Sequence, residues 1–197
     1  MSDEEIKIHR GLNNVYFDRT KTTYINGKEG ILEYRGYNIH DLAEKSSFEE
    51  VSYLLLYGKL PTKNELDAFN SSLKESREIP SQVIDIIKSI KDSHPMDVLR
   101  TAVSALSAFD EEASDKSYDA TMRKGIRLTS QVPTIVMAHN SIRNGKDPVD
   151  PSKELSHAAN FIYMLDGRIP SDSTASLMDK DFIVHADHGS NASAFAA

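Results

Sequence analysis

The chain has 197 residues and a formal net charge of −7 at pH 7, with 39% hydrophobic and 27% charged residues. This composition is typical of a soluble globular protein, and the acidic balance excludes general electrostatic binding to nucleic acid or to an anionic membrane. The sequence contains no cysteine, which excludes disulfides, thiol catalysis and iron–sulfur ligation. No apolar run is long enough to cross a membrane and the first residues are acidic, so we expect no membrane span, no secretory signal and a cytoplasmic location.

The first predicted element is a β-hairpin that follows a polar tail at residues 1–20. Residues 22–25 and 28–34 contain the β-branched and aromatic side chains that strands favour. Between them lie Asn26 and Gly27, and an Asn-Gly pair favours the two positive φ angles of a type I′ turn. We therefore predict a hairpin with a two-residue turn, and this is the only β element that the sequence clearly indicates.

From residue 38 to residue 90 the apolar spacing is that of short helices. Their predicted cap positions are Ser46 or Ser47, Thr62 with Glu65 three residues later, and Pro80. Gly58, followed by Pro61, is the predicted end of the second helix. Four short helices joined by short turns form an antiparallel helical array.

Two longer helices and two shorter ones follow. The longer helices are predicted at residues 94–109 and 118–144, with Pro133 kinking the second. Ser152 or Ser156 is predicted to cap the next helix, and Ser171 or Ser173 the last one. The fold class predicted for the chain is therefore mainly α, a multi-helical domain with a small amino-terminal β-hairpin.

The candidate functional residues lie at or near the carboxy-terminal end of the last predicted helix, in the sequence HADHGSN at 185–191. We expect His185 and His188 to lie on one helical face, because they are three positions apart, and Asp187 to point away from His188. The pair has three interpretations: ligands of a metal ion, donors to an anionic substrate, or a structural pair at a helix end.

These interpretations make different demands on the rest of the chain. A zinc site needs a third and a fourth ligand; His157 and the acidic residues are candidates in principle, but the sequence contains no second histidine- or carboxylate-rich motif at ligand spacing. A small dicarboxylate needs a few convergent donors, which imidazoles and the small residues after them supply. His157 itself is expected to be an exposed or capping residue near a helix start, and Arg35 and Arg100 to be surface or ion-paired residues.

The segment HADHGSNAS at 185–193 resembles the H-x-D-H-x-x-N-A-S segment of citrate synthases, which include the similar 2-methylcitrate synthases. Further pieces that resemble this family occur in the same order at residues 30–37, 48–55, 58–61, 94–96, 133–135 and 155–165. The family's usual threonine after Asn-Ala-Ser is Ala194 here, which is a mild departure.

The resemblance implies a nearly all-α acyltransferase that condenses acetyl-CoA with oxaloacetate and water to give citrate and CoA, at the entry to the tricarboxylic acid cycle. By position in the motif, His188 matches the histidine that contacts oxaloacetate, and His185, Asp187 and Asn191 match supporting positions. Acetyl-CoA is a co-substrate, and the resemblance implies no cofactor and no metal. It also implies a homodimer formed through the helices near 95–109 and 118–144.

In this family the other catalytic histidines, the catalytic aspartate and the substrate-binding arginines lie downstream of this motif. We therefore expect residues 21–197 to be the amino-terminal part of a citrate synthase-like large α domain, without the catalytic carboxy-terminal portion. No residue within the chain is assigned as catalytic. The chain alone is expected to be inactive, and to be unstable or to self-associate. Two alternatives stay open: a 2-methylcitrate synthase that uses propanoyl-CoA, and a non-catalytic helical interaction module.

Overall fold

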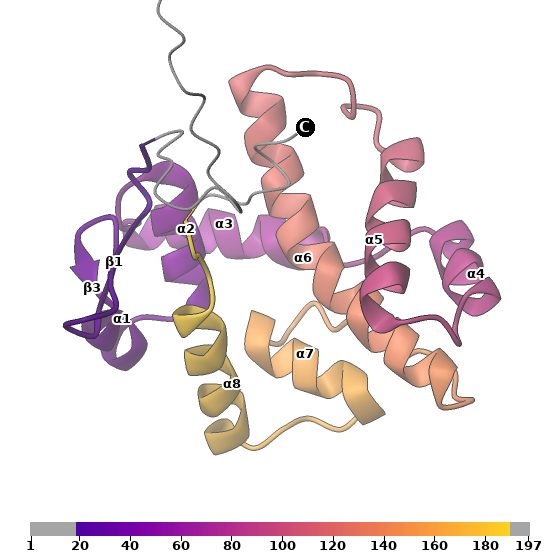
Figure 1. The fold of residues 1–197 in the computed structure, drawn as a ribbon. Coiled ribbons are helices and arrows are strands. Elements are labelled where there is room, and N and C mark those ends of the chain that lie inside the picture. Colours follow the sequence, from indigo (N-terminus) through magenta and orange to yellow (C-terminus); the bar gives the residue numbers. More distant parts are fainter. Residues whose placement is uncertain (1–18, 190–197) are drawn as a thin grey trace, which may run out of the picture.

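A computed structural model describes residues 19–189 and shows helices packed around one long central helix, with a small sheet at one side (Figure 1). The strands are β1 (Thr23–Asn26), β2 (Ile31–Tyr34) and β3 (Tyr37–Asn38). The helices are α1 (Ile39–Lys45), α2 (Phe48–Tyr57), α3 (Lys63–Glu75), α4 (Ser81–Ser89), α5 (Pro95–Leu106), the 3-10 turn η2 (Ser107–Phe109), α6 (Tyr118–Arg143), α7 (His157–Asp166) and α8 (Asp172–Val184). The mainly α fold class is confirmed, and none of the helices described is long and apolar enough to cross a membrane.

The sheet is antiparallel with the strand order β1-β2-β3, and it differs from the prediction in its turn. Asn26 pairs with Ile31, so residues 27–30 form the connection. The predicted type I′ turn is wrong, because the positive φ angle lies at Gly30 and not at Asn26 or Gly27. The side-chain oxygen of Asn26 accepts the backbone N–H groups of Lys28 and Glu29, and this local bonding stabilises a longer loop. The short strand β3 was not predicted.

The helix boundaries follow the capping signals in the sequence. Ser47 and Glu50 form a capping box at the start of α2, and Thr62 and Glu65 form another at the start of α3. Gly58 ends α2 in the left-handed conformation, with a φ of 80°. Ser156 and Ser171 are the observed caps of α7 and α8, so one member of each predicted pair is confirmed.

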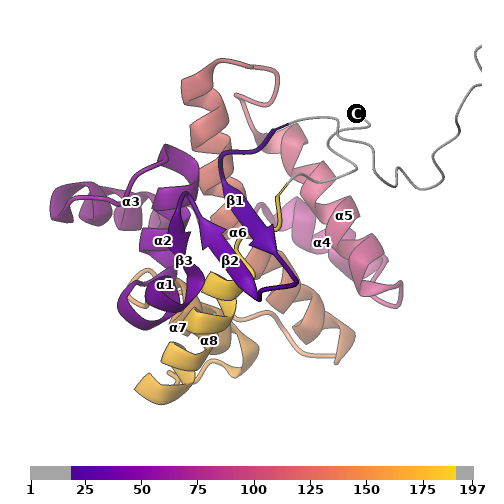
Figure 2. The ribbon, with the colours of Figure 1, turned by 60° about the vertical axis from the view of Figure 1, so that its left-hand side comes forward.

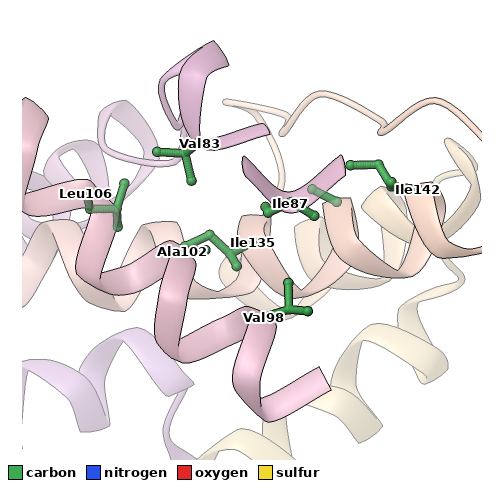
Figure 3. Packing of buried hydrophobic residues seen from close by; sticks show 8 residues of the cluster. Val83, Ile87, Val98, Ala102, Leu106, Ile135 and Ile142 are labelled. Atoms are coloured by element: carbon green, nitrogen blue, oxygen red, sulfur yellow. The ribbon is translucent and has the colours of Figure 1, made fainter. Parts of the chain in front are cut away.

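The long helix α6 packs against α3, α4, α5 and α7 and continues through Pro133. Its apolar face forms the main core together with α4 and α5 (Figure 3). The buried members of this core are Val83, Ile87, Val98, Ala102, Leu106, Ile135, Ala138 and Ile142. Burying branched apolar side chains of this kind is the main favourable contribution to folding, so α6 is the scaffold for the surrounding helices.

A second core lies between the sheet, α1, α2 and the end of α8. Its buried members are Tyr34, Ile39, Leu42, Val51, Leu54 and Ile183. Ile183 belongs to the last turn of α8, so this core fixes the end of that helix against β2 and α2. Figure 2 shows the segment after α8 running beside β1, which places residues 185–189 of the predicted functional motif next to the sheet.

Candidate functional site

The predicted functional motif begins where α8 ends. The helix stops at Val184, and His185 is its C-cap residue, so Asp187 and His188 lie beyond the helix. The prediction that His185 and His188 share one helical face is therefore wrong. In a continued helix, Val184 O would accept from residue 188 and the Asp187 N–H would donate to residue 183. The hydroxyl of Tyr34 takes both positions instead, because it donates to Val184 O at 3.2 Å and accepts from Asp187 N at 3.3 Å.

Asp187 is bonded to the sheet and to its own loop. Its Oδ2 atom accepts from the hydroxyl groups of Thr22, at 3.2 Å, and Thr23. The same oxygen accepts from the backbone N–H of Gly189 at 3.0 Å, which closes a turn around His188. Within residues 19–189, the bonds of this carboxylate go to hydroxyl and backbone groups and not to an imidazole.

The two histidines of the motif occupy different positions. The ring of His185 bonds through Nδ1 to Asp181 O at 2.8 Å, and the Asp181 carboxylate is 3.5 Å from the same nitrogen. His185 is thus held by the last turn of α8. His188 is exposed and lies in the turn between Asp187 and Gly189. The other predicted supporting residue, Asn191, lies outside the described residues.

A buried histidine was missed near this region. His157 is the first residue of α7 and is only 4% exposed, so the expectation of an exposed or capping residue is wrong. Its ring lies 4.8 Å from that of Phe48 and 5.7 Å from that of Phe182. Burial, with a smaller effect from the positive charge of Arg77, lowers the pKa of His157 to about 4. The histidine is therefore neutral at pH 7.

Arg77, in the connection between α3 and α4, is also buried, with 1% of its surface exposed. Its guanidinium donates to the carbonyl oxygens of Ser152 and, at 3.0 Å, Leu155. Burial lowers the pKa of this guanidinium, and the charge of Glu49 opposes that effect. Arg77 thus holds the chain just before α7. No sequence pattern marks this residue, because its acceptors are distant in sequence.

The two arginines considered from the sequence have separate roles. Arg100 forms an exposed ion pair with Asp97 at 3.1 Å, as expected. Arg35 has a positive φ of 51° and donates to Leu55 O at 2.8 Å, which ties the β2–β3 turn to the end of α2. Neither arginine contacts the segment at 185–189 through a hydrogen bond or ion pair found in the described chain.

A cavity in the described part of the chain lies away from the motif. It has a volume of about 590 Å³ and lies between the end of α5, the acidic loop at 110–113 and α6. Phe109 and Leu128 are among its apolar residues, and Arg127 closes one side through bonds to Asp110 and Glu112. No group of three or more histidine, aspartate or glutamate side chains that could hold a metal ion is found within residues 19–189.

The fold and the placement of the motif together define a helical domain of the citrate synthase type. The sequence matches the family described as "Citrate synthase, C-terminal domain" over residues 11–197. The chain belongs to the citrate synthase family.

Similar proteins are named either citrate synthase or 2-methylcitrate synthase. The citrate synthase of Deinococcus radiodurans is 47% identical over 191 residues, which cover 96% of this chain and 51% of that protein. The 2-methylcitrate synthase of Mycobacterium tuberculosis is 38% identical over 196 residues, which cover 99% of this chain and 49% of that protein. The chain thus spans about half the length of the curated relatives it matches.

Solved structures of citrate synthases have the same fold. The Pyrobaculum aerophilum enzyme superimposes with a TM-score of 0.91 at 39% identity, over 96% of this chain and 49% of that one. The Thermoplasma acidophilum enzyme, solved as a ternary complex with carboxymethyl coenzyme A and oxaloacetate, has a TM-score of 0.87 at 28% identity, over 96% of this chain and 50% of that one.

Proposed function

We propose that residues 21–197 form the amino-terminal part of the large α domain of a citrate synthase. The proposed reaction is the condensation of acetyl-CoA with oxaloacetate and water to give citrate and CoA, an acyl transfer at the entry to the tricarboxylic acid cycle. The main support is the HADHGSNAS segment, which follows α8 and presents an exposed His188 in a chain of this family. The ternary complex of the Thermoplasma relative supports the same substrates.

His188 is proposed to contact oxaloacetate. Its imidazole is exposed on a loop whose neighbouring residues are held by hydrogen bonds, so the ring is free to donate to a carboxylate or carbonyl oxygen. Asp187 supports this position through its bonds to the hairpin, and His185 through its contact with the end of α8. Asn191 is assigned as a supporting residue from the motif alone.

The half described here is proposed to be inactive by itself. Removing a proton from the methyl group of a thioester requires a positioned base and donors for the developing enolate oxygen. Within the motif, the imidazole of His188 is assigned to substrate binding, and the opposing base and donors are proposed to come from the other half of the enzyme. We further propose a homodimer formed through α5, η2 and α6. A cytoplasmic location and a lack of nucleic-acid binding stay predictions.

Two other functions remain as alternatives. The match to a 2-methylcitrate synthase favours a second candidate that uses propanoyl-CoA. The two acyl groups differ by one methylene, and such a difference depends on the walls of the acyl pocket. A non-catalytic helical interaction module is the third candidate.

A chimeric enzyme tests these functions. Residues 1–197 are joined to the second half of the Deinococcus citrate synthase, and citrate formation is measured with acetyl-CoA and with propanoyl-CoA. We expect activity with acetyl-CoA and a loss of about a hundredfold or more in the His188→Ala variant, since His188 supplies a substrate contact near the reacting atoms. The variant His40→Ala, at an exposed site on α1, is the control and should keep full activity.

The outcomes separate the three candidates. Higher kcat/KM with propanoyl-CoA would support the 2-methylcitrate function instead. A folded chimera without either activity would favour the interaction module. A His188→Ala chimera as active as the parent would contradict the role of His188.

A further inference from the structure

One cross-strand pair of the hairpin contacts the segment that carries His188. Thr23 on β1 and Tyr34 on β2 are direct partners in the antiparallel register. Directly opposite residues point to the same face of a sheet, and here both side chains reach Asp187. Figure 2 shows that the segment after α8 lies beside β1. A single position of the sheet therefore binds both the backbone and the side chain of Asp187.

Tyr34 binds the backbone on both sides of the turn after α8. The residue is fully buried, and its hydroxyl donates to Val184 O and accepts from the backbone N–H of Asp187. A tyrosine hydroxyl is already protonated at pH 7, and burial raises the pKa of this one further, so it remains a donor. The hydroxyl supplies a hydrogen-bond donor to the Val184 carbonyl, which has no partner within the helix end, and so takes the place of a further helical turn.

The carboxylate of Asp187 connects the hairpin to the residue after His188. Its Oδ2 atom accepts from the hydroxyls of Thr22 and Thr23 and from the N–H of Gly189. Gly189 has a φ of 83°, a conformation that glycine adopts without strain. The hydroxyl of Thr22 also lies 2.7 Å from the hydroxyl of Thr20. Because the Thr22 hydroxyl donates its proton to Asp187, the Thr20 hydroxyl donates to Thr22. The turn around His188 is thus bonded at both ends.

We propose that Thr23 and Tyr34 are positioning residues for the substrate-binding histidine, and that they act on His188 through Asp187. This inference rests on the proposed role of His188. The hydroxyl groups of the hairpin bind Asp187, and the Asp187 carboxylate in turn accepts from the Gly189 N–H, while the ring of His188 stays exposed. Holding a binding group in its productive conformation before the substrate arrives reduces the entropy lost on binding.

Amide hydrogen exchange on the full 197-residue chain tests the positioning directly. We expect Tyr34→Phe to speed exchange of the Asp187 amide about tenfold, because it removes the acceptor and leaves the ring in the core. Thr23→Val is expected to speed exchange of the Gly189 amide by a similar factor, and Thr23→Ser, which keeps the hydroxyl, should restore the slow rate. Tyr24→Phe and Thr101→Val are matched controls at exposed sites and should leave both rates unchanged.

Amides within α6 report whether a variant acts on the whole fold. Unchanged exchange at residues 187 and 189 in Tyr34→Phe and Thr23→Val would overturn the proposal. An equal rise at these residues and in α6 would also overturn it, because the hydroxyls would then support the fold as a whole. Faster exchange limited to the segment 185–189, reversed by Thr23→Ser, supports the proposal.

The chimeric enzyme connects this conformation to function. In it, Tyr34→Phe and Thr23→Val are expected to raise the KM for oxaloacetate about tenfold and to leave the KM for acetyl-CoA unchanged, with Thr23→Ser restoring the parent value. An unchanged KM for oxaloacetate in a chimera whose segment exchanges faster would overturn positioning for binding. If the parent chimera forms no product while the exchange pattern is as expected, the proposed function fails and the conformational role of the hairpin stands.

Discussion

The carboxylate of Glu49 on α2 accepts a hydrogen bond from the backbone N–H of His157, the first residue of α7, at 2.8 Å and across 108 positions of the sequence. Glu49 is only 6% exposed. The first N–H groups of a helix have no partner within it, and the helix dipole favours a negative charge at that end. The buried carboxylate and the start of α7 therefore satisfy each other, and the contact joins α2 to α7.

Replacing Glu49 tests this contact. We expect Glu49→Ala to reduce the free energy of unfolding by about 1 to 3 kcal/mol, because it leaves a buried N–H without an acceptor. Glu49→Gln keeps an oxygen acceptor and should cost less. Urea unfolding followed by circular dichroism measures both, with Glu75→Ala at an exposed site of α3 as the control. Equal stabilities for the Glu49→Ala and Glu75→Ala variants would contradict the role of Glu49.

Arg77 is expected to tolerate substitution poorly. Lysine keeps the charge but loses the planar fork that reaches Ser152 O and Leu155 O, so Arg77→Lys should destabilise the chain by about 2 to 4 kcal/mol. Arg100→Lys, at an exposed ion pair, should change the free energy of unfolding by less than about 1 kcal/mol. The same urea titration compares the two variants. A loss of stability in Arg77→Lys no larger than in Arg100→Lys would show that the buried fork is not required.

The parts of the fold that the sequence predicts correctly depend on neighbouring residues. Ser47 and Thr62 cap their helices through bonds to residues three positions away, so the signal and the structure lie in the same short segment. The signal for the turn at Asn26 also lies in neighbouring residues, but the structure there was predicted wrongly. Two hydrogen bonds to the side chain of Asn26 compete with the preference of an Asn-Gly pair for a two-residue turn. The burial of His157 and Arg77 could not be predicted, because it results from elements that meet only in the folded chain.

The functional motif shows the same division. Its position at or near the end of the last helix was predicted from the residues and is confirmed, and its helical conformation was predicted wrongly. A spacing of three positions places His185 and His188 on one face only if the helix continues through both. The hydroxyl of Tyr34, 150 positions before Val184, binds the end of the helix instead. A single side chain distant in sequence thus changes which motif residues face the same way. The spacing of the motif residues gives no indication of this effect.

The buried His157 predicts a specific dependence of stability on pH. Its pKa is about 4 in the folded chain, below the value of 6.5 expected when the chain is unfolded. The unfolded state therefore binds the proton first, so the stability that neutral His157 provides is complete above pH 6.5 and is lost as the pH falls toward 4. The expected loss is about 3 kcal/mol across this range. Urea unfolding at a series of pH values measures it.

The variant His157→Phe isolates this contribution, because its ring fits beside Phe48 and Phe182 and does not titrate. Its stability should fall less steeply between pH 6.5 and 4 than that of the parent, whereas His40→Phe at an exposed site should keep the parent slope. Burial raises the pKa of Asp179, so the contribution of this carboxyl group to stability has the opposite pH dependence and is lost as the pH rises. Asp179 is present in all three proteins, so its effect cancels in the comparison. Identical slopes for the His157→Phe variant and the parent would contradict the prediction.

The exposed apolar surface of α6 predicts self-association of the chain. Leu128 is 39% exposed and Phe109 is 44% exposed, and both line the cavity between α5 and α6. Burying a leucine contributes about 1.5 to 3 kcal/mol, so Leu128→Glu should weaken association by roughly tenfold to a hundredfold. The new carboxylate would also lie at a cavity that Asp110 and Glu112 already line. Size-exclusion chromatography with light scattering over a range of concentrations gives the dissociation constant.

A second exposed leucine provides the matched control for this interface. Leu177 on α8 is 71% exposed and lies outside α5 and α6, so Leu177→Glu should leave the dissociation constant unchanged. A parent chain that stays monomeric at all concentrations would contradict association through this surface. Weaker association in Leu177→Glu than in Leu128→Glu would place the contact on α8 instead, since a charge disrupts an apolar interface only where it becomes buried.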